Sequence, residues 1–197
     1  MTRIISGFAG SLSLAVPKQG TRPTSDRVRE AIFSALEAQD ALRRARVLDL
    51  YAGSGALGLE AASRGAASVT LVEKNQVAAG LCRRNVEAVR KAAPTRAAPD
   101  LRVSAQSVQT FLGSAAGRFD LVFLDPPYDL GDAELGRALA ALVPLLSEDA
   151  VVVVERNVRS PEPAWDTALE LTKRKDYGDT SVWYARMREQ PPYTSVA

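Results

Sequence analysis

From residue 47 onward, short apolar runs alternate with amphipathic segments, and this alternation restricts the possible fold more than any other feature. Apolar runs cover residues 47–51, 68–73, 101–105, 119–125 and 150–155, and helical patterns separate them at 56–64, 77–89, 107–112 and 133–146. Five strands joined by helices predict an α/β fold with a mostly parallel, doubly wound sheet. Two further runs, 168–175 and 181–187, flank Tyr177-Gly178-Asp179 and predict a hairpin that completes seven strands with an antiparallel edge.

The first 45 residues follow a different pattern. Short β-like runs at 3–6 and 11–16 predict a small hairpin, and Thr24 or Ser25 is placed to cap a helix with an apolar face. Residues 1–46 hold eight Lys and Arg against four Asp and Glu, a surplus of four, whereas the whole chain has a net charge of +2. We therefore expect a basic N-terminal hairpin and helix extension at 1–45, a catalytic domain at 46–189 and a loose tail at 190–197, with a polyanion such as nucleic acid as partner.

Composition excludes several kinds of chemistry. The chain contains no His and a single Cys, so Ser-His-Asp triads, disulfides within the chain and most zinc sites are ruled out. No apolar stretch approaches the roughly 18 residues of a membrane helix, and the first residues do not form a signal peptide. We expect a cytoplasmic protein that binds neither a membrane nor a metal.

A glycine-rich turn follows the first strand of the alternating region. It reads Asp49-Leu-Tyr-Ala-Gly53-Ser-Gly55-Ala-Leu-Gly58, and Glu73 ends the second strand 20 residues after Gly53. Glycines allow backbone N–H groups to approach a ligand, and a carboxylate at the end of the second strand can bind both hydroxyls of a ribose. The pattern predicts a cofactor that contains adenosine, without saying which one.

The fourth strand ends in Asp125-Pro126-Pro127-Tyr128. The prolines fix the backbone and lack N–H donors, so the turn is stiff and its carbonyl groups can act as acceptors. A carboxylate, carbonyl oxygens and an aromatic ring suit a planar group that carries an amino donor. Ligands of open α/β sheets bind at this edge, beyond the carboxyl ends of the strands.

Two features separate the candidate cofactors. Asp49 would place a negative charge near a bound pyrophosphate, which is unfavourable, but the same charge is favourable beside the ammonium group of a methionine. The turn at Asp125 has no role in hydride transfer. Together they favour S-adenosylmethionine over a dinucleotide.

These motifs resemble those of class I, Rossmann-like, S-adenosylmethionine-dependent amino-methyltransferases. The N-terminal block, with Arg3-Ile-Ile, Gly7, Gly10, Pro17, Arg22-Pro-Thr and Asp26-Arg-Val-Arg29-Glu-Ala, is similar to that of RsmD-type guanine-N2 methyltransferases of small-subunit (16S) ribosomal RNA. The resemblance runs from Arg3 to about Tyr184. It implies methylation of a guanine N2 amino group in that RNA, within an assembled or assembling small-subunit particle.

The resemblance also assigns roles to residues. At the acceptor site, the catalytic candidates are Asp125, Pro126, Pro127 and Tyr128. The cofactor candidates are Asp49, Tyr51, Gly53, Gly55, Gly58, Glu73, Ser107 and Val108. Related enzymes usually carry Asp or Asn followed by Ala where this chain has Ser107 and Val108, so the adenine contacts differ. The RNA-binding candidates are Arg3, Arg22, Thr24, Arg27 and Arg29, and the side chains of Arg22, Arg27 and Arg29 can point outward because they lie before or off the apolar face of the helix.

Other functions remain open at this point. The same chemistry could act on adenine N6 of a nucleic acid or on a glutamine amide of a protein, although the N-terminal block argues against both. A dinucleotide-dependent oxidoreductase is disfavoured by Asp49 and the turn at Asp125. A non-catalytic RNA-binding assembly factor is disfavoured by the intact Asp125 and Tyr128.

Overall fold

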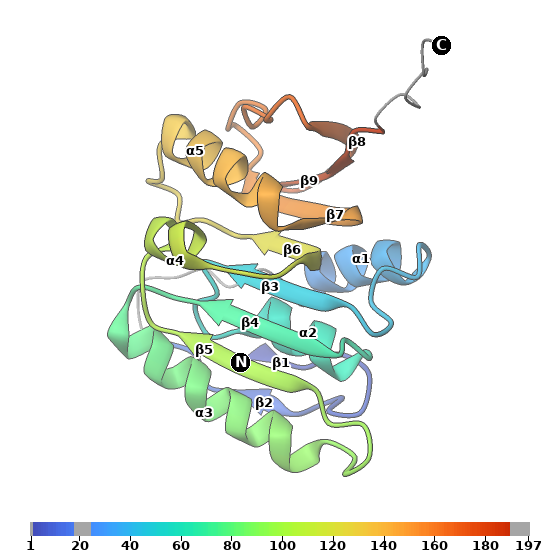
Figure 1. Cartoon of the computed structure of the whole chain (residues 1–197). Coiled ribbons are helices and arrows are strands. Elements are labelled where there is room, and N and C mark those ends of the chain that lie inside the picture. The colour runs from blue at the N-terminus through green and yellow to red at the C-terminus, as the bar shows by residue number, and fades with distance from the viewer. Residues whose placement is uncertain (1, 18–24, 190–197) are drawn as a thin grey trace.

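The computed structural model describes residues 2–17 and 25–189. Its main sheet has seven strands in the order β5-β4-β3-β6-β7-β9-β8 (Figure 1). Strands β3 to β7 run parallel to one another, and β9 runs antiparallel to both β7 and β8. The predicted doubly wound sheet with an antiparallel edge hairpin is confirmed. The bounds are β3 Arg46–Leu50, β4 Ser68–Val72, β5 Asp100–Ser104, β6 Phe119–Leu124, β7 Leu146–Asn157, β8 Leu169–Tyr177 and β9 Thr180–Met187.

Helices cover both faces of this sheet. Helices α1 (Asp26–Glu37), α2 (Ala56–Ser63) and α3 (Gln76–Ala92) share one hydrophobic cluster with the sheet. Helices α4 (Val108–Ser114) and α5 (Asp132–Leu142), with a 3-10 turn at Val143–Leu145, share the other. Both faces of the central strands are therefore buried, as their unbroken apolar sequences require. No helix in the described ranges is long and apolar enough to cross a membrane.

Two elements differ from the sequence prediction near Pro144. The helix expected at 133–146 ends at Leu142, and the following turn has 3-10 geometry because proline cannot donate to a continuing α-helix. Strand β7 begins at Leu146 rather than at 150, because the first residues pair with β6 across a register shift. Both differences lie at the end of the sheet far from the glycine turn.

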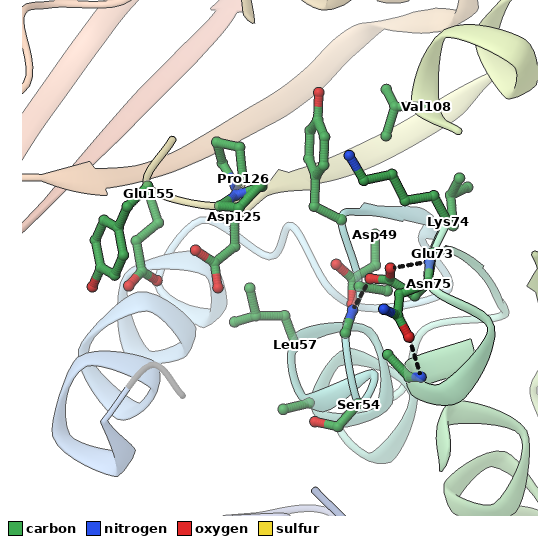
Figure 2. Close-up of a pocket in the computed structure, with 18 of the residues that line it drawn as sticks. Asp49, Ser54, Leu57, Glu73, Lys74, Asn75, Val108, Asp125, Pro126 and Glu155 are labelled. Carbon is green, nitrogen blue, oxygen red and sulfur yellow. Dashed lines mark hydrogen bonds between the residues drawn. The ribbon is translucent and has the colours of Figure 1, made fainter. Parts of the chain in front are cut away.

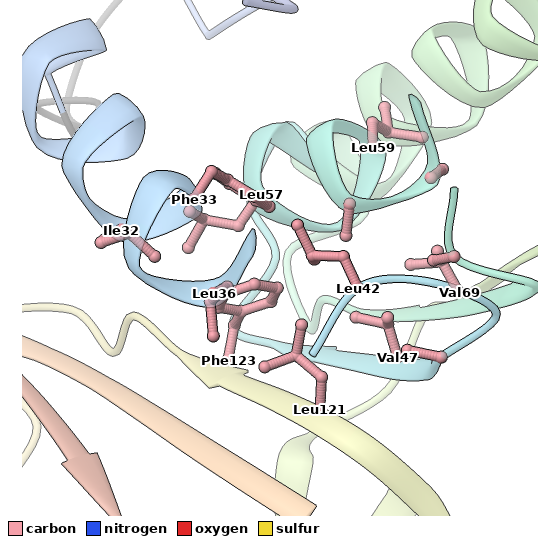
Figure 3. Close-up of a cluster of buried hydrophobic side chains, with 14 of the residues drawn as sticks. Ile32, Phe33, Leu36, Leu42, Val47, Leu57, Leu59, Val69, Leu121 and Phe123 are labelled. Carbon is pink, nitrogen blue, oxygen red and sulfur yellow. The ribbon is translucent and has the colours of Figure 1, made fainter. Parts of the chain in front are cut away.

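The core beneath α1 and α2 is tightly packed. Phe33 of α1 and Phe123 of β6 lie with ring centroids 5.7 Å apart, and both are fully buried (Figure 3). The guanidinium of Arg64 lies 5.1 Å from the Phe33 ring centroid. The contact between α1 and β6 fixes the strand that Asp125 directly follows.

The N-terminal extension is built onto α2 and α3. Its strands β1 (Thr2–Arg3) and β2 (Ser13–Leu14) form the predicted hairpin, although each is only two residues long. The buried carboxylate of Glu60 in α2 accepts hydrogen bonds from Ile5 N at 2.6 Å, Ser6 N at 3.0 Å and Arg64 Nε at 2.7 Å. The extension thus contacts the sheet domain through buried polar groups.

A second link comes from Asn85 of α3, which is 3% exposed. Its Oδ1 accepts from Ala15 N, and its Nδ2 donates to the carbonyl oxygens of Ala15 and Ser54. Ile4, Ala9 and Leu14 belong to the same hydrophobic cluster as the sheet. The boundary predicted at residues 45 and 46 therefore does not separate two independent hydrophobic cores.

Candidate functional site

A cavity of about 750 Å³ lies at the carboxyl ends of β3, β4, β6 and β7 (Figure 2). Strand β3 is central, with β4 and β5 on one side and β6 and β7 on the other. The connections leave β3 and β6 in opposite directions, so this is the switch point where open α/β sheets bind ligands. The cavity is lined at one end by the glycine turn and at the other by the turn after β6.

Glu73 fixes the first end of the cavity. Its Oε2 accepts from Gly53 N at 2.9 Å and its Oε1 accepts from Asn75 N at 2.7 Å. The carboxylate therefore holds the glycine turn against the end of β4, as Figure 2 shows. Gly53 has φ +55°, and a Cβ there would meet nothing within 4 Å, so its backbone faces open space in the cavity. Both residues line the cavity as predicted.

The other two glycines of the turn act differently from the prediction. Gly55 and Gly58 are buried and do not line the cavity. A Cβ at Gly58 would lie 2.8 Å from Val69 Cγ1 and 3.0 Å from Asp49 Oδ2, and one at Gly55 would lie 2.9 Å from Cys82 Sγ. Their small size allows α2 to pack closely on β4 and α3. Their close contacts support the packing of the glycine turn.

Asp49 is a buried carboxylate at the cavity wall, 1% exposed. Its Oδ2 accepts from Gly58 N at 2.8 Å. Burial raises the pKa of Asp49 to about 7, the Gly58 N–H opposes this shift, and the nearby charges of Asp125 and Glu73 add to it. A carboxyl group with this pKa gains its negative charge most easily when a cation binds beside it.

Tyr51 adopts a left-handed backbone with φ 62°, which is unusual for a residue that carries a Cβ. Its side chain lines the cavity, and its hydroxyl is buried without a hydrogen-bond partner in the described part of the chain. Burial raises the pKa of Tyr51 to about 12, so the hydroxyl remains a donor at neutral pH. Strain and an unpaired buried hydroxyl are both features of functional sites.

The predicted adenine contacts are only partly brought together. Val108 lines the cavity, but Ser107 does not, and its hydroxyl instead caps α4 by accepting from Thr110 N at 3.1 Å. Serine is a preferred N-cap residue, so local helix capping explains its side-chain position. The Ser107 hydroxyl is therefore engaged in the helix cap, and Val108 is the residue of this pair that faces the cavity. Val77, an apolar residue in the helical pattern predicted at 77–89, would belong to a buried stripe by that pattern, but it is 72% exposed and lines the cavity.

The turn after β6 forms the second end of the cavity. Asp125, Pro126, Pro127 and Tyr128 all line it. Asp125 is half-buried, and the Tyr128 ring is 65% exposed, so one face of the ring is open to a partner. The Pro127 carbonyl closes the turn by accepting from Leu130 N at 3.0 Å. This bond adds to the stiffness that the two prolines give the turn.

Sequence reasoning missed several residues at this end. Glu155, Arg156 and Asn157 at the end of β7 line the cavity, as does Thr180 at the start of β9. Arg156 donates to Leu130 O at 3.2 Å and to Asp132 Oδ1 at 3.1 Å, which ties β7 to the turn after β6. The rule that predicted Asp125, a polar residue at the carboxyl end of a parallel strand, also applies to Glu155.

The predicted RNA-binding residues differ in their exposure to solvent. Arg27 is exposed, and the Arg3 side chain is 62% exposed beside Asp26. Arg22 and Thr24 lie outside the described residues. The outward orientation expected for Arg29 is wrong, because its side chain is fully buried. Its Nη2 donates to Arg3 O at 2.6 Å and to Asp26 Oδ1 at 2.7 Å. These bonds hold it under the hairpin, so it does not point outward.

The sheet order, the paired ends of the cavity and the turn after β6 define a class I methyltransferase. The family model described as Conserved hypothetical protein 95 matches residues 2–186, and the chain belongs to this family. This confirms the resemblance to RsmD-type methyltransferases.

Three relatives illustrate the similarity. Ribosomal RNA small subunit methyltransferase D of Escherichia coli (strain K12) is 34% identical over 180 residues, which cover 91% of this chain and 86% of that protein. Putative rRNA methyltransferase YlbH of Bacillus subtilis is 34% identical over 183 residues, covering 91% and 96%. The solved structure of the putative methyltransferase yhhF from Escherichia coli superposes with a TM-score of 0.80 at 31% identity, covering 96% and 99%.

Proposed function

We propose that this chain transfers a methyl group from S-adenosylmethionine to the exocyclic N2 amino group of a guanine in small-subunit ribosomal RNA. The names of the relatives support the RNA substrate. The observation that carries the chemistry is that two carboxylates line one cavity. Asp125 is half-buried and directly precedes two prolines, and Asp49 is buried. An acceptor for an amino group and a carboxylate for a cationic cofactor thus share one space. We place this activity in the cytoplasm.

The cavity fits S-adenosylmethionine. Asp49 would bind the ammonium group of its methionine, Glu73 the ribose hydroxyls, and the open backbone at Gly53 would follow the chain between them. Tyr51 offers a buried donor, and Val77 and Val108 offer apolar surface for the adenine. When bound, the cofactor supplies a methyl group on a sulfonium that leaves as a neutral thioether.

The residues at the second end act on the acceptor. The lone pair of an exocyclic amino group is delocalised into the purine ring, which makes the nitrogen a poor nucleophile. Asp125 and the Pro126 carbonyl accept hydrogen bonds from its two N–H groups. These bonds favour a pyramidal nitrogen and direct its lone pair toward the methyl group. The nitrogen gains the methyl group and loses one proton, which Asp125 is placed to accept. The chain has no His, so alignment carries the reaction more than acid–base strength does.

Tyr128 would hold the target base. A purine stacked on an exposed aromatic ring gains about 1–3 kcal/mol. A paired base cannot reach a cavity at the edge of a sheet, so the target nucleotide must be unpaired or flipped out of its helix. The choice of nucleotide then depends on RNA shape and backbone, which we assign to the exposed basic side chains of the extension.

The proposed function is tested by mass spectrometry of ribosomal RNA nucleosides from cells that lack this chain. We expect one N2-methylguanosine of the small subunit to disappear and to return with the wild-type chain, but not with an Asp125→Ala variant. Loss of an N6-methyladenosine instead would favour the adenine alternative. Full restoration by the Asp125→Ala variant would favour a non-catalytic assembly factor.

Cofactor affinity should depend on pH through Asp49. The free protein holds a proton on Asp49 below about pH 7, whereas a bound ammonium group favours the ionised carboxylate. Affinity should therefore be full above pH 7 and should fall below it, approaching about tenfold per pH unit. Since the chain contains no His, few other groups titrate in this range. The measurement is titration calorimetry with S-adenosylmethionine between pH 5.5 and 8.

Two controls accompany this titration. The compound 5′-methylthioadenosine lacks the methionine ammonium group, and its affinity should change much less with pH. Asp49→Asn should bind the cofactor more weakly and remove the pH dependence. An affinity that stays constant from pH 5.5 to 8 in the wild type would contradict the role of Asp49. The same pKa predicts that Asp49 contributes progressively less stability to the free protein as pH rises from about 4 to 7.

RNA affinity should depend on the basic extension. Reversing charge with Arg22→Glu and Arg27→Glu should weaken RNA binding while cofactor affinity and melting temperature stay near wild type. Each lost phosphate contact should reduce the slope of log K against log salt by roughly 0.7–0.9. Charge reversal is preferred to truncation, because removing residues 2–17 would strip the buried partners of Glu60 and Asn85. The comparison pair is Arg83→Glu with Arg84→Glu, on the exposed side of α3. Should only this second pair weaken RNA binding, α3 is the RNA-binding surface.

A further inference from the structure

The cavity contains a second carboxylate beside Asp125. Strands β6 and β7 are parallel and in register, with Leu124 paired to Val154, so the next residues, Asp125 and Glu155, are neighbours. Side chains alternate between the two faces of a sheet along each strand, so Asp125 is on the same face as Phe123, and Glu155 is on the same face as Val153. Phe123 and Val153 belong to the hydrophobic cluster on the α1 side of the sheet. Their side chains therefore project toward the same face, and Figure 2 shows both carboxylates directed into the space beside Leu57. Glu155 is 9% exposed and lines the cavity.

The proposal rests on the function proposed above and concerns which base the cavity accepts. A guanine presents N1–H next to its N2 amino group, whereas an adenine presents an unprotonated N1 next to its N6 amino group. Ionised carboxylates only accept hydrogen bonds. We propose that Glu155 is a specificity residue that accepts the N1–H of the target guanine while Asp125 and the Pro126 carbonyl accept its amino group. An adenine would bring a lone pair against the same carboxylate.

Arg29 supplies an independent observation on the same cavity. Its side chain is fully buried and lines the cavity, and its Nε and Nη1 have no hydrogen-bond partner among residues 2–17 and 25–189. Buried donors without partners are rare in folded proteins and indicate a group that binds there. The O6 atom of guanine is an acceptor of the required kind. The cavity thus offers acceptors for N1–H and N2–H and a donor for O6, which matches guanine and not adenine.

The test compares two target bases that both carry the N2 amino group. In 2-aminopurine the N1 atom is unprotonated, so Glu155 would lose its hydrogen bond and face a lone pair. RNA is made with guanine or 2-aminopurine at the position that the wild-type chain methylates, as free RNA or in reassembled particles, whichever form the wild type modifies. Sites built around a buried polar group reject analogues that lack the matching atom. We expect the wild type to prefer guanine in kcat/KM by at least about 100-fold.

The decisive variant is Glu155→Gln. An amide can accept from N1–H of guanine and can also donate to the bare N1 of 2-aminopurine. The preference for guanine should therefore fall at least tenfold, whereas a merely structural role would lower both rates equally and leave the ratio unchanged. The missing O6 of 2-aminopurine affects wild type and variant alike, so the change in the ratio reports on Glu155. Cofactor affinity should stay within about twofold of wild type.

Two further variants keep the test decisive. Glu155→Asp keeps the charge but withdraws the carboxylate, so the preference should also fall, mainly through slower methylation of guanine. Glu148 lies exposed at the other end of β7, so Glu148→Gln should leave the preference for guanine unchanged. If the wild type methylates guanine N2 and both Glu155 variants keep its preference, the role of Glu155 is refuted while the proposed function stands. If the wild type methylates no guanine N2, both proposals fail together.

Discussion

Asp125→Ala should lower turnover by about 100- to 1000-fold while cofactor affinity and melting temperature remain near wild type. This loss corresponds to about 2.7–4 kcal/mol, the typical effect of removing one group that stabilises developing charge in a transition state. Asp125 follows the last residue of β6, and its side chain lies on the cavity, away from the bonds of Glu73 that hold the glycine turn. The substitution therefore removes an acceptor for the amino group and leaves the hydrogen bonds of Glu73 to the glycine turn in place.

The measurement is single-turnover methyl transfer to RNA, beside calorimetry with S-adenosylmethionine and thermal melting. Asp125→Asn keeps the shape and one carbonyl acceptor, so it should retain more activity than Asp125→Ala. Asp149→Ala, at an exposed position of β7, serves as the matched control and should have full activity. Turnover of Asp125→Ala within about tenfold of wild type, roughly 1.4 kcal/mol, would show that the carboxylate does not act on the amino group.

The second large effect is expected from Glu60→Ala, which should destabilise the fold by about 3–5 kcal/mol. The carboxylate is fully buried and accepts from two backbone amides of the extension and from Arg64, whose side chain is only 3% exposed. Removing it leaves the three donors of these part-buried hydrogen bonds without that acceptor, and each unsatisfied donor costs free energy. For a chain of this size the melting temperature should fall by roughly 6–20 °C.

Glu37→Ala provides the matched control for this prediction. Glu37 also pairs with Arg64, at 3.1 Å, but its side chain is half exposed, so its loss should cost at most about 1 kcal/mol. Hydrogen exchange of the Ile5 and Ser6 amides should accelerate in Glu60→Ala and not in Glu37→Ala. Equal melting temperatures for the two variants would show that Glu60 does not hold the extension in place.

Much of the fold and part of the site could be predicted from the sequence because both depend on local patterns. Alternating strands and helices predict a parallel sheet, and a parallel sheet places the carboxyl ends of its strands at one edge. Asp49 lies at the next-to-last position of one such strand, Glu73 and Asp125 directly follow two others, and all three line the cavity. Their positions needed only strand boundaries and the direction of the chain.

The remaining features depend on contacts between distant segments. Glu60 has the pattern of an ordinary helix residue, but its backbone partners are 54 and 55 residues away. Arg29 has the charge of a surface residue, yet the hairpin covers it. Ser107 has the position of a cofactor residue, but helix capping directs its hydroxyl elsewhere. No periodicity in the sequence reports which segment folds over another.

Asn85 connects the N-terminal extension to the glycine turn through a single side-chain amide. It holds Ala15 of the extension through both backbone groups and Ser54 of the cofactor turn through its carbonyl oxygen. If RNA binding shifts residue 15, Asn85 would pass that shift to Ser54 in the glycine turn. Thermodynamic linkage then requires reciprocity: the factor by which RNA changes cofactor affinity equals the factor by which cofactor changes RNA affinity. Under the proposed function, such a coupling would make the binding of RNA and of cofactor cooperative in either order of arrival.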